Sequence, residues 1–337
     1  MSPVPSLGKL LASPRSLVAL ALCIGAIWFG MTHIAHHANE SPFQTLYLHL
    51  KPEALVWHPP HAEPGVEAAA PGPADHVLAV PANFLPALFT RPLGAGPEDS
   101  PSGQRYLVLT NLQLFQLLAV LLVLVFFSGV PKHVRTGQGD APTRMAAGFA
   151  QWIRDEMVYP VMHKELGSKF LPYFLCVFFF ILFMNLAGLL PGAATATASI
   201  FVTAALALTT FLSMIVCGMA IQGPIAFWKH LVPHVPLALW PLMFVVELIG
   251  LLVKPFALMI RLFANMTGGH LVVLSFMGLI FFFAQQMGAA AGWGVSPLAV
   301  GFAVFIMIIE SFVALLQAYV FTQLSILFVN ASVHPEH

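Results

Sequence analysis

The chain has 337 residues, of which 58% are hydrophobic and only 8% are charged. Soluble domains usually carry about a quarter charged residues, so most of this chain must face lipid or other protein. Its 14 basic and 14 acidic residues balance, which argues against nucleic acid as a partner. The sequence has neither a GxxxxGK phosphate loop nor a GxSxG elbow, so we predict no cofactor and place any nucleotide chemistry on another chain.

The N-terminal third differs in character from the remainder. Residues 16–32 form a short apolar run that follows Lys9 and Arg15, and we assign residues 1–38 to a signal peptide or an N-terminal membrane anchor. Residues 39–105 are polar and rich in Pro, His and Ala. This composition predicts an extracytoplasmic, poorly ordered segment.

The remaining residues, 106–337, form a polytopic domain with five apolar stretches. A bilayer span needs about 20 apolar residues, and each stretch reaches that length. The stretches are 106–129, 170–190, 198–221, 236–287 and 297–331. The last two exceed a perpendicular span, so we expect strong tilt or a kink, with Pro255 as the kink site. We predict an all-α integral membrane protein with five transmembrane helices, the last two forming a long hairpin.

An amphipathic helix is predicted between the first two spans, at residues 145–169. Its apolar residues Phe149, Trp152, Ile153 and Met157 recur at helical spacing among charged ones, which is typical of a helix lying at the membrane interface.

The distribution of basic residues predicts how the chain is oriented. They cluster within 131–169, at Lys229 and near the N-terminus, and the positive-inside rule places these parts in the cytoplasm. The hairpin turns at 191–197 and 288–296 then face outside, and the C-terminus is cytoplasmic.

The last two spans contain ionisable and polar residues that lipid penalises. A charge at mid-bilayer costs at least about 2.5–3.5 kcal/mol, so such residues are functional candidates. They are Glu247, Lys254, Arg261, Asn265 and His270, followed by Glu310 and Gln317. At about 100° per residue the first four share one helical stripe, whereas His270 is turned to the face opposite Arg261. We interpret Lys254 as a residue that snorkels toward the interface.

An antiparallel hairpin sets the register of these residues. Pairing Arg261 with Gln317 puts the middle of the turn at residue 289, and pairing His270 with Glu310 puts it at 290. Both positions lie in the sequence GAAAGWG. Gln317 is therefore expected level with Arg261, and Glu310 level with His270, about 12 Å nearer the outer face. This arrangement predicts a titratable pair on a proton entry path and an arginine barrier at mid-depth.

Three stretches resemble subunit a of the F-type ATP synthase membrane sector. They are KPFALMIRLFANMTGGH at 254–270, MNLAGLLP at 184–191 and LLQAYVFTQLSILF at 315–328, and the resemblance covers residues 106–331 in order. It implies a stator subunit beside a rotating ring of c subunits, each with a membrane carboxylate, and peripheral-stalk b subunits as further partners. It also implies a multi-pass protein of a bacterial-type inner membrane.

The resemblance assigns roles around the arginine. Arg261 matches the essential stator arginine, which separates two offset half-channels. Asn265 and Gln317 match polar neighbours of that arginine, and Glu247 matches a carboxylate of the cytoplasmic half-channel.

The resemblance also assigns an outer half-channel. His270 and Glu310 match its interacting pair, with the acidic and basic members exchanged relative to many bacterial members, which preserves the interaction. Asn185 matches another polar position of this path. Some members carry an acidic residue three positions later, where this chain has Gly188, so that carboxylate is absent or moved.

Other interpretations remain open. His270 and Glu310 could be a buried pair that only holds the hairpin together, and asparagine or glutamine side chains often bond across membrane helices. A stand-alone ion channel or secondary transporter would show inverted repeats, and a polytopic enzyme would show a clustered catalytic set; the sequence displays neither. The cysteines Cys23, Cys176 and Cys217 lack metal-ligand spacing, so we predict no metal site.

Overall fold

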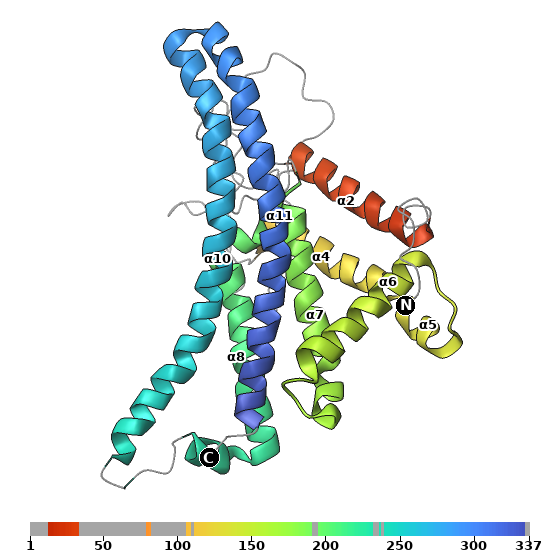
Figure 1. The fold of residues 1–337 in the computed structure, drawn as a ribbon, viewed down its shortest axis with the longest axis vertical. Helices are drawn as coiled ribbons and strands as arrows, with labels where there is room; N and C mark the ends of the chain where they lie inside the picture. Colours follow the sequence, from red (N-terminus) through yellow and green to blue (C-terminus); the bar gives the residue numbers. More distant parts are fainter. Residues whose placement is uncertain are drawn as a thin grey trace.

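The protein is built from long helices that lie side by side (Figure 1). The computed structural model describes residues 13–33, 79–81, 106–108, 111–190, 195–231, 236 and 239–333. The elements are α2 (Pro14–His33), β1 (Ala79–Pro81), β2 (Tyr106–Val108), α4 (Asn111–Phe127), α5 (Val130–Thr136), α6 (Ala141–Trp152), η1 (Ile153–Val158), α7 (Lys164–Gly188), η2 (Ala196–Ala198), α8 (Ile200–Gln222), α9 (Pro224–His230), α10 (Trp240–Met287) and α11 (Ala289–Val333). Within these residues, five helical segments are long and apolar enough to cross a membrane: α4 with α5, then α7, α8, α10 and α11. The predicted all-α membrane fold is confirmed.

The two longest helices, α10 and α11, form the predicted hairpin. They have 48 and 45 residues, or about 70 Å each, far beyond the roughly 30 Å of a hydrocarbon core. The turn between them is tighter than the predicted segment 288–296. Gly288 alone makes it, with a φ of +90° that favours glycine. Residues 289–296 already belong to α11, because three alanines at its start favour the helix despite the nearby glycines.

Pro255 lies inside α10 without ending it. The helix is continuous from Trp240 to Met287, and its N-terminal part leans away from α11 (Figure 1). A proline removes one helical hydrogen bond and commonly bends a helix. The extra length is thus accommodated by tilt and curvature of an unbroken helix.

A hydrophobic core joins η1, α7, α10 and α11. Its fully buried large side chains include Phe178 from α7, Leu262 from α10 and Phe321 from α11. Aromatic packing extends this core to α4, where the ring centroid of Phe126 lies 5.1 Å from that of Phe179. Lipid tails are as apolar as these side chains, so close packing holds the helices together more than exclusion from water does. Because this core covers one face of α10, the opposite face of the helix is the exposed one.

The predicted amphipathic segment at 145–169 is interrupted in the structure. α6 passes into the π-helical turn η1, and α7 begins after a short break. Ile153 and Met157 are fully buried, whereas Arg154 and Asp155 lie at the surface and form an ion pair at 2.8 Å. The hydrogen bond from the Arg154 guanidinium lowers the pKa of the Asp155 carboxyl. The apolar spacing therefore predicted the two-faced character of this segment but not its change of pitch.

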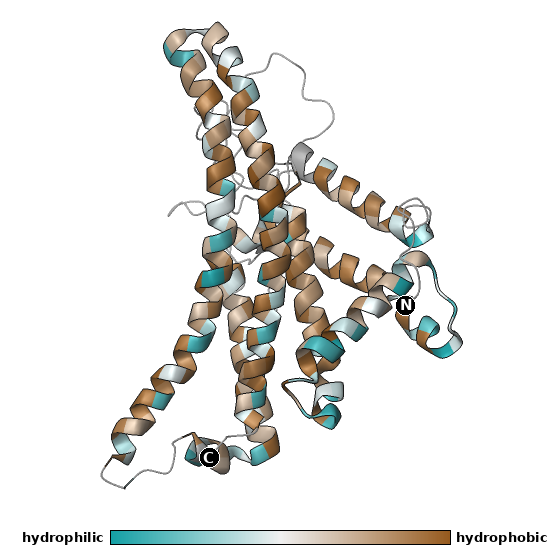
Figure 2. Ribbon diagram, in the orientation of Figure 1, coloured by the Kyte–Doolittle hydropathy of each residue, from teal (hydrophilic) through white to brown (hydrophobic). Residues whose placement is uncertain are grey.

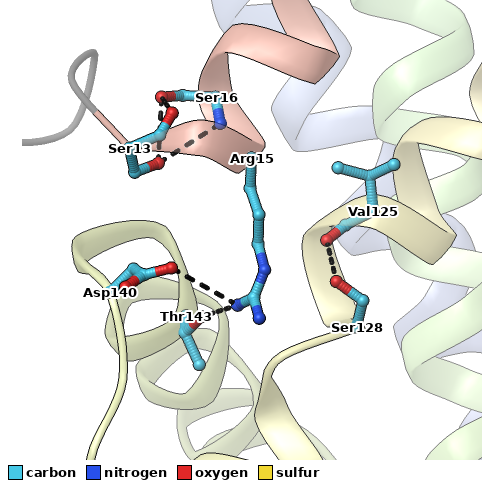
Figure 3. A network of polar contacts seen from close by, with 7 residues as sticks. All are labelled: Ser13, Arg15, Ser16, Val125, Ser128, Asp140 and Thr143. Carbon is cyan, nitrogen blue, oxygen red and sulfur yellow. Dashed lines mark hydrogen bonds and ion pairs between the residues drawn. The ribbon is translucent and has the colours of Figure 1, made fainter.

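The N-terminal helix α2 lies along α4 (Figure 1). The side chains that pack at this contact are Ala19, Leu22, Cys23 and Ala26 of α2 and Leu112, Phe115, Leu118 and Leu122 of α4. Arg15 reaches from α2 to the start of α6, where it hydrogen-bonds to Thr143 and approaches Asp140 at 4.0 Å (Figure 3).

A short two-stranded antiparallel sheet precedes α4, with Val80 opposite Leu107. Residues 106–108 were predicted to open the first span, which begins instead with α4 at Asn111, because these three residues pair as β2. Of the predicted poorly ordered segment 39–105 the structure describes only residues 79–81. The remainder of that prediction lies outside the described residues.

Candidate functional site

The part of the hairpin nearer Gly288 holds the expected titratable pair. His270 on α10 and Glu310 on α11 lie 3.4 Å apart, measured from Nε2 to Oε1, which confirms the contact expected from the register. The Glu310 side chain is only 3% exposed. Gly269 makes room for this carboxylate, because a Cβ added there would lie 2.6 Å from Oε1. The two helices therefore bring an acid and a base together inside the protein.

A third residue, Thr195, contacts the same imidazole from a different element. Its Oγ1 lies 2.8 Å from Nε2 of His270. Thr195 was not predicted from the sequence, because residues 191–197 were expected to form an outward-facing turn. In the structure, Thr195 and Thr197 are buried, and the short helix η2 packs against α7, α8 and α10. A signal was present directly after Pro191 and Gly192, since the following run AATATA contains no charged, glycine or proline residue.

Asn185 on α7 lies in the same buried region. Its Nδ2 donates to the backbone carbonyl of Ala314 on α11 at 3.4 Å. One turn later, Gly188 packs against Thr195, and a Cβ added at this glycine would lie 2.8 Å from Thr195 Cγ2. Gly188, where the resemblance implied an absent or moved carboxylate, therefore adjoins the hydroxyl that bonds His270.

Several buried polar atoms of this region have no hydrogen-bond partner among the described residues. They are the Oδ1 atom of Asn185, the Oγ1 atom of Thr197 and both carboxyl oxygens of Glu310. A buried polar atom without a partner costs about 1–3 kcal/mol, and such atoms are rare in native structures. Of these atoms, Oε1 of Glu310 lies against the imidazole of His270.

Asn265 and Gln317 form the second polar contact across the hairpin. The Nδ2 atom of Asn265 donates to Oε1 of Gln317 at 2.9 Å, and Gln317 is 1% exposed. Gln317 was expected level with Arg261, whereas it bonds to the residue one turn further along α10. The hydrogen bond fixes Asn265 immediately beside the arginine.

Arg261 lies on the outer surface of α10 rather than in the core. Among the described residues, no carboxylate lies within ion-pair distance of it. Phe256 and Ile260, in the preceding turn and a half, are exposed apolar side chains. Figure 2 shows hydrophilic bands in the middle of α10, within a mostly hydrophobic helix. Arg261 is thus a cation on an apolar surface, without a partner in the described part of this chain.

Glu247 and Lys254 continue the stripe of Arg261 toward the N-terminal end of α10. Glu247 is half-buried and lies fourteen residues from Arg261, or about 21 Å along the helix, too far for direct contact. The Nζ of Lys254 lies 5.7 Å from the centre of the Phe328 ring on α11. The structure therefore brings together two pairs, His270 with Glu310 and Asn265 with Gln317, and keeps Arg261 and Glu247 apart.

The family model described as ATP synthase A chain matches residues 113–330 of this chain. The chain belongs to the ATP synthase A chain family. It is 41% identical over 223 residues to ATP synthase subunit a of Chloroherpeton thalassium, which is 65% of each chain. It is 45% identical over 206 residues to ATP synthase subunit a of Myxococcus xanthus, 61% of this chain and 65% of the relative. The chain thus spans just under two thirds of the length of these relatives.

A further relative extends the similarity over more of the chain. ATP synthase subunit a 2 of Prosthecochloris aestuarii is 35% identical over 317 residues, 91% of each chain. All seven predicted site residues lie inside the region matched by the ATP synthase A chain model, and so does Thr195. With its five spans, this member of the ATP synthase A chain family is a multi-pass membrane protein.

Proposed function

We propose that this chain is the proton-translocating stator subunit of a rotary F-type ATP synthase, working against a ring of c subunits. The observation that carries the proposal is the exposed position of Arg261 on an apolar helix face. Arginine remains charged at every physiological pH, and lipid penalises that charge heavily. A carboxylate presented by a neighbouring subunit supplies the partner that the described part of this chain lacks.

The polar residues on either side of Arg261 support two separate proton paths. Toward the hairpin turn, His270 begins about 13 Å from Arg261 along α10 and leads to Glu310 and Asn185. Toward the other end of α10, Glu247 stands about 21 Å from the arginine. A proton enters by the first path and neutralises a carboxylate of the ring, which can then face lipid without the cost of a charge. After rotation of the ring, the proton leaves near Glu247.

Arg261 separates these two paths. Its positive charge attracts each arriving ionised carboxylate and repels protons that would pass directly from one path to the other. The hydrogen-bonded pair Asn265 and Gln317 lies about one helical turn from it, on the side of the entry path. Arg261 is then the gate between two half-channels, and the other polar residues line or adjoin those half-channels rather than one continuous channel.

The proposal also assigns sides and partners. The loop between α5 and α6, the α9 region and the C-terminus lie in the cytoplasm, and η2 and Gly288 lie toward the outside, as the basic residues favour. Peripheral-stalk b subunits hold the chain in place against the torque of the ring. Nucleotide chemistry takes place on other subunits. A stand-alone channel or secondary transporter fits less well, because its ion path would be enclosed within the chain, whereas Arg261 faces outward.

Arg261→Ala in the assembled complex tests the proposal. Reconstituted vesicles carrying this variant should lose proton-driven ATP synthesis, because nothing then separates the two paths or attracts the ring carboxylate. Lys254→Ala is the matched control, since it removes a cation of the same stripe that has its own contact with Phe328. Full retention of coupled synthesis by Arg261→Ala, at parental levels of assembly, would contradict the proposed function.

A further inference from the structure

We propose that Thr195 is a positioning residue of the outer proton path, whose hydroxyl holds the imidazole of His270 beside the carboxylate of Glu310. This inference rests on the proposed function and deepens it by a residue outside the three motif stretches. One ring nitrogen of His270, Nε2, has two oxygen neighbours. Nε2 lies 2.8 Å from the threonine Oγ1 and 3.4 Å from Glu310 Oε1.

The two contacts differ in kind. The contact with Thr195 meets hydrogen-bond geometry, whereas neither carboxyl oxygen of Glu310 makes a hydrogen bond within the described residues. The threonine therefore sets the orientation of the ring, and the carboxylate stands close enough to take over the same nitrogen after a small movement.

The chemistry of a hydroxyl suits this role. A threonine hydroxyl can donate one hydrogen bond and accept others, so it can bond Nε2 whether or not that nitrogen carries a proton. An ionised carboxylate can only accept. Thr195 can thus keep His270 in one position while the protonation of the His270–Glu310 pair changes. An aliphatic side chain of the same shape could not do so in either state.

The surroundings hold Thr195 itself in place. The residue is 2% exposed, and its Oγ1 also lies 3.4 Å from the carbonyl oxygen of Gly188. The glycine is needed for this approach, because a Cβ there would meet Thr195 Cγ2 at 2.8 Å. The threonine is therefore fixed from α7 as well as by the buried turn that precedes η2.

The electrostatic surroundings of the pair are simple. Residues 170–188 of α7, the η2 turn at 195–198 and all of α8 contain no charged or histidine residue. Glu310 is the titratable side chain that contacts His270 among the described residues. A difference in the dependence of transport on outer pH between Thr195 variants, which work against the same ring, therefore reports on this pair.

The test compares three variants in the assembled complex, reconstituted in vesicles. Thr195→Val removes the hydroxyl but keeps the shape, and it should lower proton-driven ATP synthesis severalfold per assembled complex and shift its dependence on outer pH. Thr195→Ser should restore most of the rate and the parental profile. Thr203→Val is the control, because Thr203 is also fully buried but bonds only to backbone carbonyls at the start of its own helix.

The outcomes separate this inference from the proposed function. A Thr195→Val complex with the parental rate and profile overturns the role of Thr195, even if Arg261→Ala abolishes synthesis. If Thr195→Val assembles poorly, the comparison of Thr195→Ala with Thr195→Ser decides, and equal pH profiles for these two overturn the inference. Retention of synthesis by Arg261→Ala contradicts the proposed function itself.

A separate observation concerns the N-terminal helix. We infer that α2 remains part of the folded chain as a sixth membrane helix and is not removed with a leader. Its 20 residues reach about 30 Å, close to the thickness of a hydrocarbon core, and Pro14–Trp28 is its apolar run in the described part, shorter than those of the five spans. Its two faces differ: Ala19, Cys23 and Ala26 turn toward α4, whereas Leu20 and Ile24 are exposed. Small residues at such spacing allow helices to approach closely in lipid.

A polar contact ties the N-terminal end of α2 to the main domain. The guanidinium of Arg15 hydrogen-bonds to Thr143 and lies 4.0 Å from a carboxylate oxygen of Asp140 (Figure 3). It also occupies the space in which a Cβ at Gly129 would lie. α2, the turn between α4 and α5, and the start of α6 thus meet at one side chain.

The mass of the chain in the purified complex tests this inference. The measured mass should correspond to a chain that includes residues 14–33. A chain that begins beyond residue 33 overturns the inference. A second measurement uses a protease site inserted within 39–78. After cleavage, the α2 fragment should remain bound to the complex in mild detergent, and Arg15→Ala should increase its loss. Complete loss of the fragment from the parental complex would contradict the docking of α2 on α4.

Discussion

Glu310 illustrates how single residues shape the outer site. Its carboxyl group is almost fully buried, has no hydrogen bond within the described residues and faces one imidazole at 3.4 Å. Burying an ionised carboxylate without compensation is very unfavourable, so the group depends on His270 or on a proton. That dependence suits a residue that accepts and releases protons. Gly269 leaves the space that this carboxyl group occupies, because a side chain at that position would collide with it.

Gly269→Ala should slow proton-driven ATP synthesis severalfold while leaving assembly intact. The added methyl group would come within 2.6 Å of Oε1 and push the carboxyl group of Glu310 away from His270. Gly301→Ala is the matched control, because a Cβ there meets no atom within 4 Å. The measurement is the initial synthesis rate in vesicles, normalised to assembled complex. Equal rates for the two variants would show that the position of Glu310 is unimportant.

The α10–α11 hairpin is the element that places every predicted residue except Asn185. Its register depends on a one-residue turn, and Gly288 adopts φ +90° and ψ +165° there. This backbone region is almost exclusive to glycine and costs other residues about 1–3 kcal/mol. The stacked rings of Phe276 and Phe302, 5.3 Å apart, support the same register further along the helices.

Gly288→Ala should therefore destabilise the purified chain by about 1–3 kcal/mol. Gly294→Ala should instead stabilise the chain. This glycine lies within α11 in open space, and alanine favours a helix by up to about 1 kcal/mol relative to glycine. Denaturation in detergent, followed by loss of helical circular dichroism, measures both. The assignment of the turn to Gly288 fails if the two substitutions change stability equally.

Over the whole molecule, the surface is largely apolar, and the charged residues gather near ends of the spans and along one stripe of α10. Large apolar side chains cover the exposed faces of α4, α8, α10 and α11. Basic residues flank the ends of the spans, and the α10 stripe interrupts the apolar surface (Figure 2). The order of the five spans places the α5–α6 loop and α9 on one side and Gly288 on the other.

Cysteine labelling in intact vesicles should report these sides. In a chain whose three natural cysteines are replaced by alanine, a cysteine at Gln138 or Lys229 should react with an impermeant maleimide from the cytoplasmic side. A cysteine at Met287, which is 71% exposed, should react only from the outside. Reaction of positions 138 and 287 from the same side would exclude the proposed topology. Permeabilised vesicles, in which all three positions should react, provide the control.

The sequence by itself determined the number of spans, the hairpin and the contact of His270 with Glu310. Each follows from a local regularity: apolar length, helical period, or the fixed rise per residue that makes an antiparallel register calculable. The same regularities predicted an amphipathic segment before α7, although the π-helical pitch at Ile153 and Met157 depends on packing against the core.

Only the tertiary structure decided which of these side chains have partners. Thr195 is far from His270 in sequence and carries no motif, and its role depends on a turn being folded inward among four helices, α4, α7, α8 and α10. The exposure of Arg261 likewise follows from which face of α10 the core covers. The helical period predicts which residues share a face of a helix. What that face contacts depends on packing against other elements, because those contacts join segments that are distant in the sequence.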